Sequence, residues 1–431
     1  MAGEWQEIPS GWRMVKLREL GEVNRGKSKH RPRYADHLYG GPYPFIQTGD
    51  IKASNGRITS YTQTYSEAGL AQSQLWPAGT MCITIAANIA ETGILEFPAC
   101  FPDSVVGFIA DKNKADIYFI EYVFRFLRQR LQREASGSVQ DNINLATLDR
   151  LRFPIPPLET QRAIAHILGT LDDKIELNRR TNQTLEAIAK ALFKSWFVDF
   201  DPVRAKLEGR QPEGMDAETA ALFPDGFGED GLPRGWVNSS HLDMVEAFGG
   251  GTPKTTNSEY WNGTIPWFSV VDAPAETDVW VLDTEKKITQ KGLEESATRL
   301  LPVGTTIISA RGTVGRLALV GVGMAMNQSC YGLYPKPPFG PFFAYFVARN
   351  LVETLQQQAH GSVFDTITRA TLQSASVVIP NPQVVARFEQ IVKPLMDGIR
   401  SCLEESRTLA ALRDSLLPKL LSGELNVGKT E

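Results

Sequence analysis

The sequence predicts an α+β protein in which two similar mixed α/β globular domains are joined by two long helices. Three observations lead to this prediction. Residues 157–198, near the middle of the 431-residue chain, carry a long heptad pattern. The second half of the sequence repeats the first half. Short β-type runs bounded by Gly, Pro and Asn fill the residues on either side of the heptads.

The heptad pattern predicts one continuous helix. At about 1.5 Å per residue, roughly forty residues would span about 60 Å, and an apolar seam of that length needs a partner helix. Asn178 and Asn182 occupy two seam positions, where polar side chains can fix the register between helices. The alternative is that the helix faces solvent at these two positions. The remaining seam residues are apolar or small: Leu168, Leu171, Ile175, Leu185, Ala189, Leu192 and Trp196.

A tandem duplication supplies the second helix. A shift of 224 positions places Pro9-x-Gly11-Trp12 on Pro233-x-Gly235-Trp236. Further matches under this shift are Ile155-Pro156 with Ile379-Pro380, Ile167 with Ile391, Leu171 with Leu395, Ile175 with Ile399 and Leu185 with Leu409. The stretch Leu75–Thr80 matches Leu300–Thr305 one position off. The predicted order is therefore globular domain, long helix, globular domain, long helix.

The first half contains three predicted segments. Residues 1–156 form a globular domain with a helix from about Ile117 to Arg133. Residues 157–200 are the central spacer helix. Residues 201–232 are a linker rich in Gly, Pro and acids. The expected β-type runs are Tyr43–Thr48, Thr80–Ala86 and Ser104–Ile109, and the linker has a short helical candidate at Ala217–Leu222.

The second half repeats this order. Residues 233–380 form the second globular domain, with a helix near Pro341–Gln358. Residues 381–425 form the C-terminal spacer helix, in which Pro394 predicts a kink or a late helix start. The expected β-type runs of this domain are Ile265–Val271, Thr305–Ala310 and Leu317–Val320.

Composition narrows the classes of protein. Hydrophobic residues make up 42% of the chain, which suits globular cores. The four cysteines have no C-x-x-C spacing, which argues against a disulfide framework or a zinc site. The N-terminus does not resemble a signal peptide and no run suits a membrane span, so we expect a cytoplasmic protein. A net charge of −4 argues against a simple basic nucleic-acid binder without excluding local cationic loops.

Several stretches, each weak evidence by itself, occur in a characteristic order. They are Gly250-Gly251-Thr252-Pro253-Lys254-Thr255 with Glu259-Tyr260-Trp261 and Ile265-Pro266-Trp267; Ser309-Ala310-Arg311-Gly312-Thr313-Val314-Gly315; Asn327-Gln328-Ser329; Ile155-Pro156-Pro157-Leu158-Glu159-x-Gln161; Trp196-Phe197-Val198-Asp199-Phe200-Asp201-Pro202; and Leu417-Pro418-Lys419-Leu420-Leu421-Ser422-Gly423. Within a duplicated chain, this set resembles the specificity subunits of type I restriction-modification systems. The resemblance covers essentially the whole chain.

The resemblance implies two target-recognition domains, each of which reads one half of a bipartite, asymmetric target in double-stranded DNA. The long helices would pack as an antiparallel coiled coil that sets the spacing and docks two methyltransferase subunits, through which restriction subunits join. The chain would be non-catalytic and bind no cofactor, because S-adenosylmethionine, ATP and Mg²⁺ would belong to the partners. The duplication supports the same picture, since two related domains can face two half-sites.

The candidate DNA-binding residues lie in polar and cationic loops. The alternating set Arg25, Lys27, Lys29, Arg31 and Arg33 would face one side of an extended strand, where cations suit phosphates. Arginines in a Gly-rich loop can bind guanine edges. The alternative for the basic run of the first half is a solvated, mobile loop, and the alternative for the second half is a turn with a surface ion pair. The candidates of the second half are Thr252, Lys254, Thr255, Thr256, Arg311, Thr313 and Arg316, and Gln47 and Asn88 are weaker candidates in the first half.

The ends of the helices are candidate docking sites. Trp196, Phe197, Phe200, Leu420 and Leu421 crowd segments where the helices should end, and the alternative is that they close the chain's own core. No nucleophile with a base, phosphate-binding loop or metal-ligand spacing is recognisable. The rival interpretation is therefore a duplicated protein-interaction scaffold. A stand-alone nuclease or methylase would require a catalytic constellation that the sequence does not display.

Overall fold

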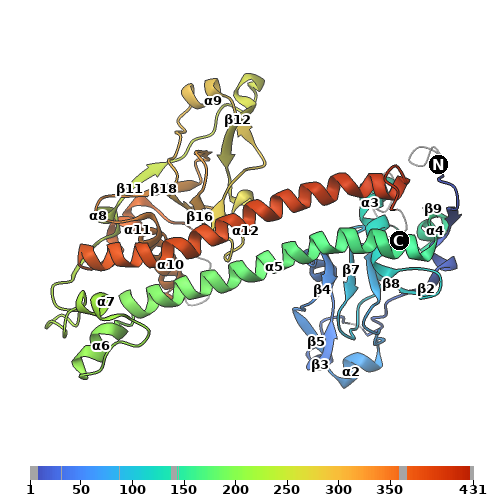
Figure 1. Cartoon of the computed structure of the whole chain (residues 1–431), viewed down its shortest axis with the longest axis horizontal. Coiled ribbons are helices and arrows are strands. Elements are labelled where there is room, and N and C mark those ends of the chain that lie inside the picture. The colour runs from blue at the N-terminus through green and yellow to red at the C-terminus, as the bar shows by residue number, and fades with distance from the viewer. Residues whose placement is uncertain are drawn as a thin grey trace. The chain divides into compact units, whose positions relative to one another are not determined.

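The computed structural model describes residues 8–30, 32–86, 88–136, 143, 145–358 and 366–427. The chain divides into two compact units. Unit 1 comprises Met1–Lys174 with Thr408–Glu431, and unit 2 comprises Ile175–Arg407. The long helices α5 (Leu158–Phe197) and α12 (Pro382–Ser422) each contribute to both units, and Figure 1 draws them as unbroken green and red ribbons.

Unit 1 is built on a mixed sheet. In the described part of the chain, this sheet has five strands in the order β2-β8-β6-β7-β4. Neighbouring strands are antiparallel except β4 and β7, which are parallel. Helix α3 (Ile117–Ser136) contributes Phe119, Val123 and Leu127 to the core shared with the sheet. The strands are β2 (Gly21–Arg25), β4 (Gly56–Ile58), β6 (Met81–Thr84), β7 (Thr92–Leu95) and β8 (Val105–Ala110).

Unit 2 repeats this sheet. Its strand order, again among the described residues, is β11-β18-β15-β16-β13, with the parallel pair once more at the β13 edge. Helix α10 (Pro341–Gln358) takes the place of α3. The strands are β11 (Val245–Gly249), β13 (Trp280–Val281), β15 (Thr306–Ser309), β16 (Leu317–Val320) and β18 (Cys330–Pro335). The duplication expected from the sequence is thus present in the topology.

Smaller elements complete both units. Strand β1 (Arg13–Val15) pairs with β9 (Phe153–Ile155), as β10 (Val237–Ser240) pairs with β19 (Ser376–Ile379). The other strands are β3 (Tyr39–Phe45), β5 (Gln63–Tyr65), β12 (Trp261–Phe268), β14 (Lys287–Ile288) and β17 (Ala325–Met326). The other helices are α1 (Thr48–Ala53), α2 (Glu67–Ala71), α4 (Leu145–Arg150), α6 (Asp201–Leu207), α7 (Ala217–Ala221), α8 (His241–Met244), α9 (Gln290–Glu294) and α11 (Arg369–Ser374).

The two long helices run antiparallel within each unit. In unit 1, Asp172 of α5 pairs with Arg413 of α12. In unit 2, Asn178 bonds Cys402 and the Leu185 side chain lies beside Gly398, so the partner residues have lower numbers as α5 advances. The seam positions Leu168 and Ala189 are fully buried. Packing of α5 on α12, as expected from the heptads, is therefore present.

The seam asparagines are buried rather than facing solvent. Asn178 is 2% exposed, and its amide nitrogen donates to Cys402 O (3.3 Å), Glu405 Oε2 (2.8 Å) and Ser406 Oγ (3.2 Å). Asn182 is 1% exposed and donates to Asp278 Oδ1 at 3.2 Å. The Asn178 bonds favour the register-fixing interpretation at that position, because a shift of α12 along α5 would leave a buried amide unpaired, whereas the partner of Asn182 lies outside α12.

The structure excludes one of the two alternatives expected at Pro394 and adds to the expected linker. Helix α12 begins at Pro382 and continues through Pro394, so the late start is excluded. Fully buried Val392 and Met396 flank this proline, and their packing offsets the hydrogen bond that proline removes. The linker is also more than a connector. It contains α7, which confirms the short helix expected at Ala217–Leu222, and also α6, which the sequence did not predict. The linker buries Val203 and Phe223 in the core of unit 2.

Candidate nucleic-acid interface

The polar loops emerge from one end of each five-stranded sheet. In unit 1, the last residues of β2 and β6 pair with the start of β8, as Arg25 lies opposite Val106 and Thr84 opposite Val105. The loops after β2 and β6 therefore leave the sheet at the same end. In unit 2, Gly249 of β11 and Ser309 of β15 pair at the start of β18 in the same way. Each sheet thus presents two neighbouring loops from equivalent strands.

The cationic run after β2 has the predicted alternation, but two of its arginines are engaged. Arg25, Lys27 and Lys29 are exposed, whereas the intervening Gly26 and Ser28 are buried. Arg25 Nε donates to the Asp103 carbonyl oxygen at 2.6 Å. The side chains of Lys27 and Lys29 form no hydrogen bond or ion pair with any described residue, so both ammonium groups face solvent.

Asp103 also holds the other described arginine of this run. Arg33 Nη2 lies 2.9 and 3.0 Å from the two carboxylate oxygens of Asp103. This exposed ion pair is weak in stability terms, but it covers a cation that was expected to face DNA. Arg31 lies outside the described residues.

The weaker candidates of unit 1 differ in exposure. Gln47 precedes α1, is half-buried, and donates through Nε2 to Gln63 Oε1 at 2.6 Å. Asn88 is exposed at the tip of the β6–β7 loop, with a left-handed φ of 47° that asparagine tolerates well. Its Oδ1 accepts from Lys52 Nζ at 3.5 Å. Asn88 is therefore the better placed of the two for an external contact.

Glycines hold the first loop of unit 2 close to the sheet. A Cβ at Gly250 would lie 1.9 Å from Asn327 O, and the Gly251 carbonyl oxygen accepts from Trp267 Nε1 at 3.0 Å. The chain then turns outward. Lys254, Thr255 and Thr256 are exposed, and half-buried Thr252 donates through its hydroxyl to Gln328.

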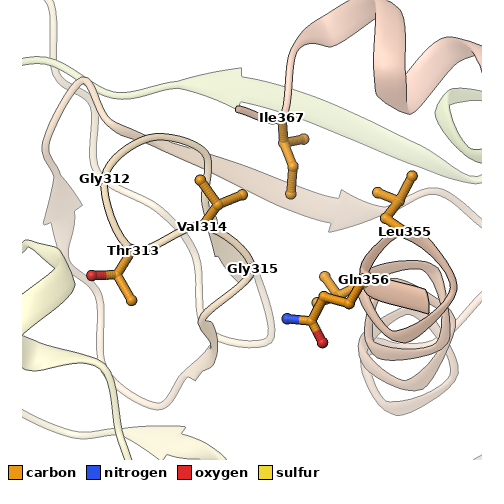
Figure 2. A pocket seen from close by; sticks show the side chains of 8 residues that line it. Gly312, Thr313, Val314, Gly315, Leu355, Gln356 and Ile367 are labelled. Carbon is orange, nitrogen blue, oxygen red and sulfur yellow. The ribbon is translucent and has the colours of Figure 1, made fainter. Parts of the chain in front are cut away.

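The second loop of unit 2 presents two guanidinium groups. Arg311 and Arg316 are exposed, and neither guanidinium bonds a described residue. Ser309 organises the loop: its hydroxyl accepts from Arg316 N at 2.8 Å and donates to Thr313 O. In Figure 2, the Thr313 side chain points away from Leu355 and Gln356 of α10.

The same hydroxyl pattern identifies equivalent residues in the two units. Thr84 Oγ1 accepts from Glu91 N at 2.9 Å and donates to Asn88 O, as Ser309 does with Arg316 and Thr313. Asn88 therefore corresponds to Thr313, and Glu91 to Arg316, under the shift of 225 that already relates Leu75–Thr80 to Leu300–Thr305. Glu91 was not singled out from the sequence, although its charge reversal in the second repeat was a signal that could have identified it.

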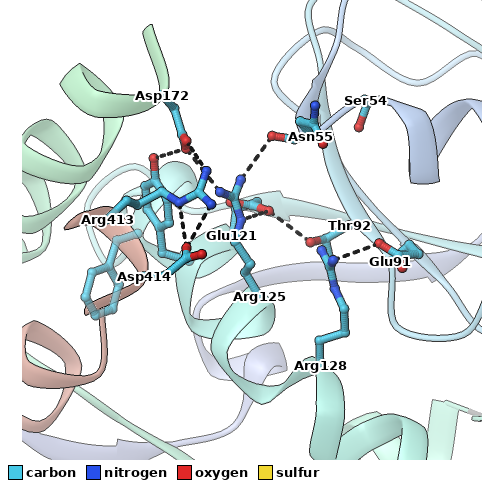
Figure 3. A network of polar contacts seen from close by, with 12 residues as sticks. Ser54, Asn55, Glu91, Thr92, Glu121, Arg125, Arg128, Asp172, Arg413 and Asp414 are labelled. Atoms are coloured by element: carbon cyan, nitrogen blue, oxygen red, sulfur yellow. Dashed lines mark hydrogen bonds and ion pairs between the residues drawn. The ribbon is translucent and has the colours of Figure 1, made fainter. Parts of the chain in front are cut away.

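Buried charges hold the base of the β6–β7 loop to the long helices (Figure 3). Thr92 Oγ1 donates to Glu121 Oε1 at 3.0 Å, and Arg125 of α3 pairs with Glu121 and with Asp172 of α5. Arg413 Nη1 of α12 lies 2.6 Å from Asp172 Oδ1. The network thus joins the sheet, α3 and both long helices within unit 1.

Burial and the neighbouring cations shift the pKa values of the Glu121 and Asp172 carboxyls in opposite directions. Burial raises the pKa of Glu121 despite the nearby Arg125. Burial also disfavours the charged form of Asp172, but Arg125, Tyr122 and Arg413 outweigh it and lower the pKa of Asp172. These side chains join the elements that carry the β6–β7 loop of unit 1.

The aromatic and leucine residues expected to dock partners are packed inside the chain. Trp196 and Phe197 are 3% and 5% exposed in the core of unit 2, and Leu420 and Leu421 are 3% and 1% exposed in the core of unit 1. Phe200 packs against the unit 2 core and contacts Trp236. The alternative, that these residues close the chain's own core, accounts for their placement.

Two further kinds of feature are absent from the part of the chain that the structure describes. No group of three or more His, Cys, Asp or Glu side chains among them could hold a metal ion. No helix within the described ranges is long and apolar enough to cross a membrane.

Comparisons with known proteins agree on one family. The family model described as type I restriction modification DNA specificity domain matches twice, at residues 9–187 and 233–405. The type I restriction enzyme HindI specificity subunit of Haemophilus influenzae is 28% identical over 74% of this chain and 80% of its own length. The MjaIX specificity subunit of Methanocaldococcus jannaschii is 25% identical over 98% and 95%, respectively.

A solved structure has the same fold. The S subunit of a type I restriction-modification system from M. genitalium matches 96% of both chains with a TM-score of 0.56 and 15% sequence identity. This likeness concerns the fold and extends over both halves of the chain.

Proposed function

The chain belongs to the family of type I restriction-modification DNA specificity domains and carries two of them, and on that premise we propose how it recognises its target. It is a specificity subunit with two recognition domains. Each domain reads one half of a bipartite, asymmetric DNA sequence. The observation that carries this proposal is the repeated sheet, which in both units presents two polar loops from the same end.

The exposed cationic residues fall into two classes, lysines and arginines. Lys27, Lys29 and Lys254 carry compact ammonium groups, which suit phosphates and contribute affinity that falls with salt. Arg311 and Arg316 carry planar guanidiniums, which suit the O6 and N7 acceptors of guanine. The local concentration of these groups reconciles DNA binding with a net charge of −4.

Asn88 and Thr313 occupy equivalent loop positions with different side chains. An asparagine amide suits the N6 and N7 edge of adenine, whereas a threonine can contact the thymine methyl or bond either type of base. Different residues at the same place in the two loops support an asymmetric target, since the two halves would be read by different chemistry.

Helices α5 and α12 set the separation of the half-sites in this proposal. The buried Asn178 contacts with α12 would fix the register between the two helices, and a fixed register gives a constant spacing. We further place partner docking on the outer face of α5, where Leu177 is 56% and Ile188 is 49% exposed. Two methyltransferase subunits would dock there and recruit restriction subunits, and S-adenosylmethionine, ATP and Mg²⁺ would be bound by these partners.

The test is a selection of random DNA duplexes by the chain co-expressed with its methyltransferase subunit, at physiological salt. Two short fixed motifs at a constant separation support a bipartite reader. Salt-sensitive binding without an enriched motif would favour the alternative of a protein-interaction scaffold. Methyl transfer or cleavage by the purified chain alone would contradict the assignment of chemistry to the partners.

A further inference from the structure

The β6–β7 loop of unit 1 is tied to its neighbouring helix α3. Arg128 Nη1 lies 3.0 Å from Glu91 Oε2, an ion pair that Figure 3 shows beside the buried network. Gln132 Nε2, one turn further along α3, donates to Ile89 O at 3.0 Å. We call Glu91, Arg128 and Gln132 the loop latch. The Glu91 and Arg128 side chains are 13% and 29% exposed, so the pair is partly shielded from water.

Unit 2 keeps the glutamine of the loop latch at the equivalent position but lacks its ion pair. The counterpart of Glu91 is Arg316, and the 224-residue shift between α3 and α10 makes Val352 and Gln356 the counterparts of Arg128 and Gln132. The acid has become a cation, and its cationic partner has become an apolar side chain. Arg316 is exposed as a result, while Val352 is only 6% exposed.

A cavity lies where unit 1 has the loop latch. It measures about 380 Å³ and lies between the Gly312–Gly315 loop and the Val352, Leu355 and Gln356 side chains of α10 (Figure 2). Gly315 sits at φ +85°, and a Cβ there would come within 2.8 Å of Val352 Cγ1. Because Gly315 has no side chain, the loop can approach α10 closely at this position.

We propose that the loop latch is a positioning device for one half-site, and that unit 2 uses the equivalent position for direct contact with DNA. This inference rests on the proposed function. In unit 1, Arg128 neutralises Glu91, which would otherwise repel the phosphates, and with Gln132 it holds Asn88 in one orientation. In unit 2, α10 offers no carboxylate at Val352, so the Arg316 guanidinium is free to bind DNA.

The two arrangements have different consequences for recognition. A loop held in its bound conformation loses little entropy on binding and tolerates few base changes. A loop above a cavity can adjust, and its arginine supplies affinity through charge. We therefore expect the half-site read by unit 1 to be strict at the base that Asn88 contacts, and the half-site read by unit 2 to depend on Arg316.

The first experiment removes the loop latch from the complex with the methyltransferase subunit. Arg128→Val gives unit 1 the residue of unit 2. Selection from random duplexes should show the base preference at one position of one half-site relaxed by about tenfold, with the other half-site unchanged. The charge-swapped variant Glu91→Arg/Arg128→Glu should restore the preference, which a purely structural defect would not allow.

The second experiment gives Arg316 of unit 2 a carboxylate partner. Val352→Glu places a carboxylate on α10 beside Gly315, where it can pair with Arg316 and add a negative charge. Binding to the selected duplex should weaken by about tenfold through the second half-site. Val352→Gln introduces a side chain of the same size as glutamate but without its charge. This variant should bind the selected duplex with an affinity within about twofold of that of the unaltered chain.

The outcomes separate this inference from the proposed function. If the unaltered complex selects a two-part motif but Arg128→Val leaves both halves unchanged, the positioning role is wrong and the specificity function stands. Equal weakening by Val352→Glu and Val352→Gln would show that packing, not the release of Arg316, governs unit 2. If the unaltered complex selects no motif, the proposed function itself fails.

Discussion

Units 1 and 2 attach the same pair of helices to the same kind of sheet by different chemistry. Unit 1 uses the buried charges of Glu121, Arg125, Asp172 and Arg413. Unit 2 uses a cluster of aromatic rings from α5, α10 and α12, in which the Phe197 and Phe388 centroids lie 5.2 Å apart. Other members of this cluster are Phe193, Trp196, Phe343 and Phe346.

One feature is nevertheless shared by both attachments. Arg125 of α3 and Arg349 of α10 are equivalent under the 224-residue shift. Arg125 pairs with Asp172 of α5, and Arg349 pairs with Glu186 of the same helix. The arginine that links each globular domain to α5 is therefore common to the two repeats, while the packing around this arginine has diverged. Substitutions at matched positions can test how far the two solutions are interchangeable.

The largest expected effect is on the aromatic cluster of unit 2. Phe388 is fully buried, and Phe388→Ala should lower the free energy of unfolding by about 3–5 kcal/mol, because it leaves a cavity among five neighbouring rings. Urea denaturation followed by circular dichroism measures this loss. The matched variant Ile164→Ala removes a smaller buried side chain from unit 1 and should cost less. An equal or larger loss of stability for Ile164→Ala would contradict the claim that the aromatic cluster contributes more than the matched position of unit 1.

The charge network of unit 1 should be nearly as sensitive. Arg125→Gln leaves the buried Glu121 carboxylate without its cation and should destabilise the chain by about 3 kcal/mol. The double variant Glu121→Gln/Arg125→Gln should recover part of this loss, since it also removes the unpaired charge. Thermal denaturation of both variants checks the prediction. No recovery in the double variant would mean that lost packing, rather than charge, explains the single variant.

His241 gives unit 2 a pH-dependent weakness that unit 1 lacks. Its ring is fully buried with both nitrogens unpartnered, and burial lowers its pKa to about 4. The unfolded chain takes up the proton below about pH 6.5 while the folded chain stays neutral until about pH 4, so stability falls across this window. The equivalent residue in unit 1 is the buried Leu17.

Replacing His241 with the unit 1 residue should therefore stabilise the chain. The advantage of His241→Leu is expected to be about 1 kcal/mol at neutral pH and to grow by about 3 kcal/mol more near pH 4. Because burial raises the pKa of Glu389 to about 7 and acts in the opposite direction, the quantity to measure is the difference between variant and unaltered chain at each pH. If the difference does not change with pH, protonation of His241 does not contribute to the pH dependence of stability.

The smallest expected effects concern the seam asparagines. Asn178→Ala removes three hydrogen bonds and should cost about 1–2 kcal/mol. Asn182→Ala should cost less, because Asn182 Oδ1 is already buried without a partner. Chemical denaturation of the two variants side by side ranks them. The reverse order would show that the bond from Asn182 to Asp278 stabilises the fold more than the three Asn178 bonds to α12.

The regular parts of the fold could be predicted because their periodicity is local. The helix expected at 157–198 is observed at Leu158–Phe197, and the one expected near Pro341–Gln358 has those bounds. Helix α6 was missed because Asp201-Pro202, which the sequence pattern indicated as a helix stop, forms the first turn of a new helix after α5 ends at Phe197. A proline near a helix boundary does not by itself show which side of the boundary is helical.

The candidate site was harder to predict because its state depends on distant residues. The alternation of Arg25, Lys27 and Lys29 is local and was predicted, but Asp103 lies far along the chain and covers Arg25 and Arg33. The burial of Trp196 and Phe197 likewise depends on the tertiary packing of α10 and α12. Charge pattern alone cannot separate a free cation from one held by a distant carboxylate.

The central claim is that each unit reads its own half of the DNA target. The most direct test compares Asn88→Ala with Arg316→Ala in selection from random duplexes by the complex with the methyltransferase subunit. We predict that Asn88→Ala relaxes base preference in one half-site only, and that Arg316→Ala weakens or relaxes only the other, with unchanged spacing between the halves. If either variant alters both half-sites equally, the two units do not act as independent readers.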